Sequence, residues 1–168
     1  GNLFRHNLRT KQQEVTLEEE LDGLEDYIYL QQMRFDGRIT VEKQILVDPA
    51  QVRLPSFTLQ PIIENAFSHG LKACEEGGRI LLRVWQQGRM LYVTVADNGK
   101  GMDEAELAAL DEKIRQSEQT GKSIGLGNIF RRVSMLYPDE GKMQVFSRAG
   151  HGTVIRFEIP QEKQEGKP

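Results

Sequence analysis

The chain has 168 residues and a mass of 19.2 kDa, which fits one domain or one domain with an appendage. It carries 22 Lys and Arg residues against 25 Asp and Glu residues, a net charge of −3, so no overall basic field favours nucleic acid. A single cysteine excludes an internal disulfide and a cysteine-based metal cluster, and no apolar run reaches the ~18 residues of a membrane span.

The first predicted element is a helix over about 16–35. Residues 1–14 are polar and look like the frayed end of a helix. Thr16 and Glu19 form a capping-box pattern, and Asp36 with Gly37 breaks the helical pattern. The apolar residues between them follow helical spacing: Leu17, Leu21, Leu24 and Ile28.

From Arg38 the apolar period changes to two, which predicts an edge or half-buried strand that ends at Asp48. A second helix is predicted from near Leu59 to near Gly70, and Pro61 is tolerated in its first turns. One broad apolar stripe defines its buried face: Leu59, Ile62, Ile63, Ala66 and Phe67.

The second half of the chain predicts two hairpins separated by two helices. The expected elements are strands over 79–86 and 90–96, a helix over 103–116, a polar segment over 116–123, a helix from 124 to Tyr137, and strands over 143–147 and 153–159. Helices and mostly antiparallel strands do not alternate strictly, which favours a two-layer α/β sandwich. The charged residues after Pro160 predict a disordered tail.

Asp97 closes a predicted strand and is followed by Gly99 and Gly101. Glycines let the backbone approach a flat ligand without interference from Cβ. A partly buried carboxylate can accept a hydrogen bond from an exocyclic amine such as that of adenine. The alternative interpretation is a plain Asp-Asn-Gly turn.

Gly121, Gly125 and Gly127 surround a predicted helix start, where free N–H groups and the helix dipole favour phosphate. No Gly-Lys-Ser/Thr ends this segment and no strand immediately precedes it, so the P-loop and dinucleotide fingerprints fail. A flexible loop before an amphipathic helix is the alternative. Likewise, the segment before Thr153, Gly-His-Gly, can be a tight hairpin.

Asn65 and His69 are four residues apart and share one face of the second predicted helix. An amide oxygen suits Mg²⁺, which usually keeps waters and bridges to substrate phosphates. Glu64 points about 100° away and could act as a base. The alternative is that these are ordinary residues of a polar helix face.

The order of these four motifs resembles the ATP-binding domain shared by histidine kinases, type II topoisomerases and related ATPases, the Bergerat fold. The local sequence is most similar to LytS/YesM-type sensor histidine kinases over roughly 15–160. The matching stretches are 15–21, 29–35, 59–70, 97–102, 123–128 and 150–153. The resemblance implies an α+β two-layer sandwich with a mixed, mostly antiparallel sheet covered on one face by helices.

The resemblance also implies roles for individual residues. Asn65 would hold Mg²⁺ against the ATP phosphates, and Glu64 would be the catalytic base or orient water. Asp97 would bind the adenine amine near Thr153, and His69 would lie near the phosphates or ribose. The pocket would be shaped by Gly99, Gly101 and Met102, the phosphates would meet Gly125, Leu126, Gly127 and Asn128, and 103–123 would be the ATP lid.

Three positions depart from the family pattern. Ser68 stands where many relatives have lysine, Ser123 replaces a common glycine, and Pro61 replaces the second asparagine of other histidine-kinase classes.

The phosphoacceptor histidine, expected in a motif like Pro-His-Phe-Asn upstream of Val15, has no match. His6 lacks the preceding proline and lies too near the ATP-binding domain.

The resemblance therefore implies the C-terminal catalytic piece of a membrane-anchored receptor, with its own part in the cytoplasm. Residues 1–35 would be the remnant of a dimerisation or linker helix, 36–160 the ATP-binding domain and 161–168 the tail. The implied cofactors are ATP and Mg²⁺. The implied partners are the protein's own upstream phosphoacceptor and dimerisation helices, a second copy of the full-length protein and a response regulator, without nucleic acid.

Two alternatives to this function stay open. A serine kinase of the anti-sigma type would share the fold and phosphorylate a small partner protein. A non-catalytic, nucleotide-gated interaction module would bind ATP without transferring phosphate.

Overall fold

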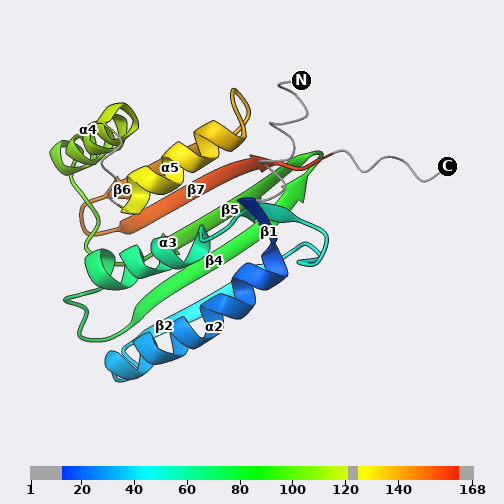
Figure 1. Cartoon of the computed structure of the whole chain (residues 1–168). Helices are drawn as coiled ribbons and strands as arrows, with labels where there is room; N and C mark the ends of the chain where they lie inside the picture. Colours follow the sequence, from blue (N-terminus) through cyan, green and yellow to red (C-terminus); the bar gives the residue numbers. More distant parts are fainter. Residues whose placement is uncertain (1–12, 121–124, 163–168) are drawn as a thin grey trace.

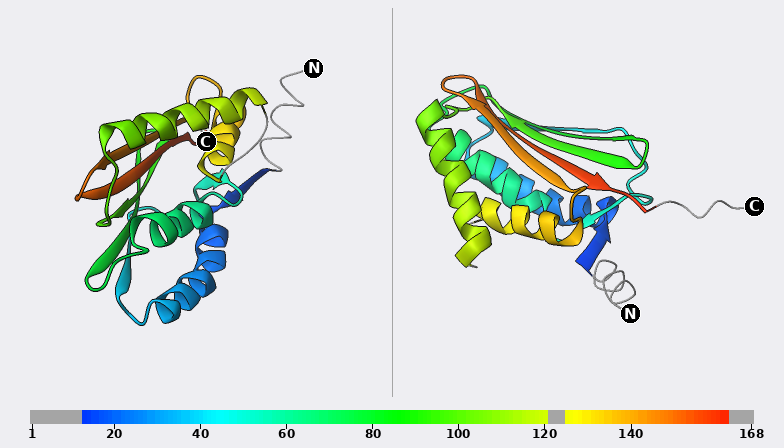
Figure 2. Two further views of the ribbon diagram at one scale, coloured as in Figure 1. Left: turned by 90° about the vertical axis from the view of Figure 1, so that its left-hand side faces the viewer. Right: turned by 90° about the horizontal axis from the view of Figure 1, so that it is seen from above.

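The computed structural model describes residues 13–120 and 125–162 of the chain. A five-stranded sheet forms one layer, and helices cover one of its faces (Figure 1 and the right panel of Figure 2). The helices are α2 (Leu17–Arg34), α3 (Leu59–Asn65) with one turn of π-helix η1 (Ala66–Gly70), α4 (Glu104–Thr120) and α5 (Gly125–Leu136). The predicted two-layer sandwich is confirmed.

The sheet has the strand order β2-β4-β5-β7-β6. Its strands are β2 (Ile39–Ile45), β4 (Gly78–Gln87), β5 (Met90–Asp97), β6 (Lys142–Arg148) and β7 (Gly152–Pro160). The pairs from β4 to β6 are antiparallel, and β2 joins β4 in parallel. In this register Asp97 lies opposite Thr153, and Thr153 lies opposite Ser147, so residues from distant motifs meet at one end of the sheet.

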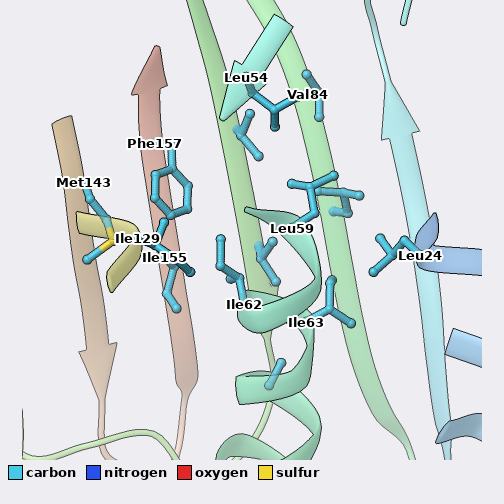
Figure 3. Close-up of a cluster of buried hydrophobic side chains, with 14 of the residues drawn as sticks. Leu24, Leu54, Leu59, Ile62, Ile63, Val84, Ile129, Met143, Ile155 and Phe157 are labelled. Atoms are coloured by element: carbon cyan, nitrogen blue, oxygen red, sulfur yellow. The ribbon is translucent and has the colours of Figure 1, made fainter. Parts of the chain in front are cut away.

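The core lies between the helix-covered face of the sheet and α3. Inward residues alternate with outward ones along β4, β5 and β7. The predicted apolar stripe of α3 and η1 is buried in full and packs against them (Figure 3). This packing fixes the helix that ends in Glu64 and Asn65 over the centre of the sheet.

Helix α2 begins as the capping-box pattern predicts, because the Thr16 hydroxyl oxygen accepts a hydrogen bond from the Glu19 N–H at 3.2 Å. Its buried residues Leu17, Leu24 and Ile28 belong to the same core cluster as α3. The division of the chain at residue 35 remains a prediction, and α2 packs as part of the described domain. No helix among the described residues combines the length and apolarity needed to cross a membrane.

A second, two-stranded sheet was not predicted. It pairs β1 (Glu14–Thr16) antiparallel with β3 (Arg53–Pro55), so the expectation of a frayed helix end is wrong at Glu14. Three residues are too few to show a period of two. Glu14 is buried, and its carboxylate accepts a 2.6 Å hydrogen bond from the Tyr137 hydroxyl.

Two further boundaries differ from prediction. Helix α4 continues to Thr120, because the polar residues after 116 include good helix formers and none of residues 117–120 is glycine. The rest of the predicted lid segment, 121–123, lies outside the described residues, and with it Gly121 and Ser123. Gln161, assigned to the tail, forms reciprocal hydrogen bonds of 2.8 Å with the backbone of Arg53, whereas 163–168 lie outside the described residues.

Burial raises the pKa of the Glu14 carboxyl above its ordinary value of 4.5, and the Tyr137 hydroxyl and Arg53 only partly offset that effect. The native state therefore holds this proton more tightly than the unfolded chain, so the free energy of unfolding falls as pH rises through the raised pKa. We expect Glu14→Gln to flatten this pH dependence in urea titrations between about pH 4 and 7. The exposed variant Glu75→Gln should leave it unchanged, and equal slopes in both variants would contradict the assignment.

Candidate functional site

A cavity of about 700 Å³ opens between α3–η1 on one side and α4–α5 on the other, at the end of β5 and the start of β7. It brings together residues from all four sequence motifs. Those that line it are Glu64, Asn65, His69, Asp97, Gly101, Met102, Gly125, Leu126 and Thr153. The lining does not include Gly99, Gly127 or Asn128.

Asp97 is half-buried at the end of β5. Its Oδ1 accepts a 2.9 Å hydrogen bond from the Gly99 N–H, and its carboxylate also accepts from the Thr153 N–H. Burial raises the pKa of Asp97 above its ordinary value of 3.8, because these two hydrogen bonds only partly offset the loss of solvent. The carboxylate is thus held in place by the backbone and keeps acceptor capacity toward the cavity.

The backbone packs so closely around Asp97 that glycine is required on two sides. A Cβ added at Gly152, which has φ +86°, would lie 1.9 Å from the Asp97 carbonyl oxygen. A Cβ at Gly70 would lie 2.7 Å from Asp97 Oδ1, and one at Gly99 would lie 1.9 Å from the Gly70 carbonyl oxygen. Gly99 therefore packs the Asp97 loop against η1, which explains why it does not line the cavity.

The rest of this loop is attached to both neighbours. The Lys100 N–H donates to the Gly70 carbonyl at 3.0 Å, and the Lys100 carbonyl accepts from the Gly150 N–H at 2.7 Å. Gly101 has φ +64°, and a Cβ there would lie 2.0 Å from the Arg148 carbonyl oxygen. The loop therefore holds Asp97 and Met102 in a fixed arrangement at the cavity wall.

Ser147 is a site residue that sequence reasoning missed. Its hydroxyl donates to the Gly152 carbonyl at 2.9 Å and accepts from the Met102 N–H at 2.8 Å. It also lies 2.8 Å from the Thr153 hydroxyl, and because its only proton goes to Gly152, Thr153 must be the donor of that bond. The signal was available in the predicted hairpin, where Ser147 lies opposite Thr153.

The other end of the cavity is formed by α3–η1 and the start of α5. Asn65 is half-buried, while Glu64 and His69 are exposed at the opening. The predicted sharing of one helix face by Asn65 and His69 is confirmed, although a π-helical hydrogen bond of 3.0 Å, from the Leu71 N–H to the Ala66 carbonyl, has replaced regular α-helix there. Gly125 faces them from the N-terminus of α5.

A second cavity of about 510 Å³ adjoins the first and shares Pro61, Glu64 and Gly125 with it. Asn128 lines this second cavity, and Gly127 is buried in α5 and lines neither. The residues of the predicted phosphate-binding segment therefore differ in position. Leu126 lines the main cavity, Asn128 lines the second one, and Gly127 is packed inside the protein. Glu64 lies at the boundary between the two.

Cationic side chains and oxygen-bearing side chains also line the main cavity. Lys100 and Lys113 line the main cavity, the latter from α4; sequence reasoning assigned neither a role. Within the described ranges no group of three or more His, Cys, Asp or Glu side chains could hold a metal ion. Two oxygen-bearing side chains with predicted roles also line the main cavity: Asn65 is the predicted metal ligand and Glu64 the predicted base.

The family model described as histidine kinase-, DNA gyrase B- and HSP90-like ATPase matches residues 56–163, and a histidine kinase family model matches 1–39. The chain is 30% identical over 160 residues to the sensor protein kinase HptS of Staphylococcus aureus, covering 95% of this chain and 30% of that protein. It therefore spans about a third of the length of the curated relatives it matches.

Two solved structures that share this fold are domains of histidine kinases. The histidine kinase domain of a blue-light activated kinase from Erythrobacter litoralis EL346 aligns with a TM-score of 0.61 at 23% identity, over 89% of this chain and 63% of that one. The catalytic domain of histidine kinase ThkA aligns with a TM-score of 0.56 at 20% identity, over 88% and 94% of the two chains. The chain therefore belongs to the family of histidine kinase-, DNA gyrase B- and HSP90-like ATPases, and its described domain has the histidine kinase catalytic fold.

Proposed function

We propose that this chain is the ATP-binding catalytic domain of a LytS/YesM-type sensor histidine kinase. It transfers the γ-phosphate of ATP to a histidine on an upstream helical domain, for relay to a response regulator. The observation that carries the proposal is that Asp97 and Asn65, 32 positions apart in sequence, line one cavity. If these two side chains lay on different sides of the molecule, they could not both contact one ATP molecule and the proposal would fail.

The Asp97 end of the cavity suits a purine. The Asp97 carboxylate is an acceptor for the exocyclic amine, and Thr153 lies beside it. Met102, Val145 and Ile155 supply apolar surface around the same end, as expected where a flat ring is buried. The cavity of about 700 Å³ has the volume of a site for a ligand of this size.

The Asn65 end suits the phosphates. The N-terminus of α5 at Gly125 offers N–H groups and a positive dipole. Ser68 replaces the family lysine, and Lys100 and Lys113 supply positive charge from other parts of the cavity lining. Asn65 would hold Mg²⁺, which supplies charge neutralisation on the transferring phosphoryl group when it is bound. His69 would contact the phosphates or ribose, with Leu126 and Asn128 on the side of α5.

Glu64 would act as the base or orient water. It is exposed at the boundary between the two cavities, so an acceptor side chain entering from outside can reach it. Phosphoryl transfer depends mostly on positioning and charge neutralisation, which assigns Glu64 a supporting contribution of about 10²- to 10⁴-fold in rate.

The proposal extends to the full-length protein, of which this chain would be the cytoplasmic part. Residues 1–35 would belong to the dimerisation or linker helix and 36–160 to the ATP-binding domain. The partners would be the protein's own phosphoacceptor helices, a second copy and a response regulator. Membrane anchoring would be supplied outside this chain.

The direct test mixes this chain with γ-labelled ATP, Mg²⁺ and the separately produced upstream helical domain. The expected result is acid-labile label on a histidine of that domain. Acid-stable label on serine would support a serine kinase instead, and tight ATP binding without transfer would support a non-catalytic module. Efficient self-labelling at His6 would overturn the assignment of the acceptor to the upstream helices.

Asn65→Ala should selectively weaken Mg²⁺-dependent binding of a non-hydrolysable ATP analogue. Removal of the amide oxygen takes away a metal ligand but leaves the Asp97 end intact. We expect a loss of about tenfold in affinity with Mg²⁺, equal to ~1.4 kcal/mol, and little change with EDTA. Calorimetric titration in both conditions measures this, and an equal loss in both would assign Asn65 a structural role.

A further inference from the structure

The loop that precedes α3, residues 56–58, is bound to α2 through its N–H groups. Glu20 of α2 accepts hydrogen bonds from Phe57 at 2.6 Å and from Thr58 and Leu59 at 3.1 Å each. Thr58 gives no side-chain cap to α3, because its buried hydroxyl donates to the Pro55 carbonyl at 2.6 Å. The carboxylate that caps the positive end of α3 therefore comes from another helix.

The same loop is bound to α5 through its carbonyl groups. The Arg132 guanidinium donates to the Phe57 carbonyl at 2.7 Å and also to the Ser56 carbonyl. A guanidinium is a planar fork of donors that can hold two acceptors in one orientation. The loop thus joins a carboxylate of α2 to a guanidinium of α5, and the two opposite charges also attract each other.

Phe57 shows that these bonds determine the loop conformation. Its φ is +58°, a region that bulky residues rarely adopt and that costs about 1–3 kcal/mol. Its side chain is 53% exposed, so burial of the ring does not explain the conformation. The hydrogen bonds from Phe57 N–H to Glu20 and from Arg132 to the Phe57 carbonyl do explain it.

The loop lies behind the phosphate end of the proposed site. Phe57 and Arg132 line the second cavity together with Glu64 and Gly125, which also line the main one. Helix α3 ends in Asn65, and α5 begins at Gly125. Whatever fixes the start of α3 against α5 therefore sets the separation between the proposed metal ligand and the proposed phosphate-binding N–H groups.

We propose that Glu20 and Arg132 are positioning residues for phosphoryl transfer, which act by holding the 56–58 loop and so set the spacing of α3 and α5 around the ATP phosphates. This inference rests on the proposed function. It assigns to α2, the helix that follows the upstream part of the chain, a direct connection to the phosphate end.

The test compares affinity for a triphosphate with affinity for adenosine, which reaches only the Asp97 end. In Glu20→Gln and Arg132→Lys, we expect affinity for a non-hydrolysable ATP analogue with Mg²⁺ to fall about five- to tenfold, because the first change weakens three charge-assisted hydrogen bonds and the second weakens two. Adenosine affinity should change less than about twofold. The matched controls are Glu18→Gln on α2 and Arg131→Lys on α5, which make the same changes at neighbouring positions.

A nucleotide-independent readout separates this inference from the proposed function. The side-chain amide resonance of Asn65, measured without ligand, should shift in Glu20→Gln and Arg132→Lys and stay in place in the two controls. An unmoved resonance would overturn the inference, as would equal losses for the triphosphate and adenosine. If the unmodified chain binds neither ligand while the resonance shifts as expected, the proposed function fails and the positioning of α3 stands.

Discussion

Asp97→Asn is expected to abolish detectable binding of an ATP analogue, a loss of at least about hundredfold or ~2.7 kcal/mol, with the fold retained. The carboxylate accepts from the N–H groups of Gly99 and Thr153 and would accept the purine amine as well. An amide has one oxygen, so its NH₂ group must face one of these three donors. Calorimetric titration measures the affinity, and circular dichroism checks the fold.

Asp111→Asn on the exposed face of α4 is the matched control, because it removes the same charge away from the purine end. A folded Asp97→Asn protein that binds nucleotide normally would show that the purine assignment is wrong. The pH dependence gives a second check. Burial raises the pKa of Asp97 above 3.8, and only the ionised carboxylate accepts hydrogen bonds with both oxygens. Affinity for the ATP analogue should therefore fall as pH decreases, and the fall should begin at a higher pH than for an ordinary aspartate.

Gly152→Ala should have the second large effect, on both stability and binding. The new methyl group would be placed 1.9 Å from the Asp97 carbonyl oxygen at a φ of +86°, so backbone strain and a collision act together. We expect a loss of about 3–4 kcal/mol in the free energy of unfolding and weaker nucleotide binding, because β5 must move at Asp97. Urea denaturation and analogue titration measure the two effects.

Gly150→Ala is its matched control in the same hairpin. Gly150 has φ +79°, and a Cβ there meets nothing within 4 Å, so only the cost of the left-handed conformation remains, about 1–2 kcal/mol. Binding should be unchanged in this variant. Equal losses in the free energy of unfolding for Gly152→Ala and Gly150→Ala would contradict the prediction, because they would show that the backbone near Asp97 can accommodate the methyl group.

Elements whose information is local were predictable from the sequence. The apolar stripe from Leu59 to Phe67 has helical spacing and is buried as expected, and the alternation on either side of Gly88 correctly gave the hairpin of β4 and β5. The motif containing Asp97, Gly99 and Gly101 could be located for the same reason. Gly101 has a positive φ, and Gly99 packs against backbone that leaves no room for a Cβ. Each requirement concerns one position, so a glycine at that position is its signal in the sequence.

Other features depend on residues far apart in the chain and had no local signal. The pairing of β1 with β3 joins three residues to three others almost 40 positions away, too short a match for periodicity to reveal. The parallel addition of β2 to β4 pairs residues far apart in the chain, such as Ile39 with Gly78, and neither strand carries a local pattern that names its partner. The extension of α4 to Thr120 was missed because polar residues can continue a helix without any apolar pattern.

The sequence by itself determined the main helices, the strands of the five-stranded sheet and the core face of α3, because these follow from spacing along the chain. It also supplied the residue types that purine and phosphate recognition require. Only the tertiary structure decided that Asp97 and Asn65 share a cavity and that Ser147 orients Thr153. It alone also showed that Glu20 caps a helix begun 39 residues later. Sheet register and helix packing set those relations. They bring together hydrogen-bonding partners that are far apart in the chain, and the spacing of residues in the sequence does not show which partners meet.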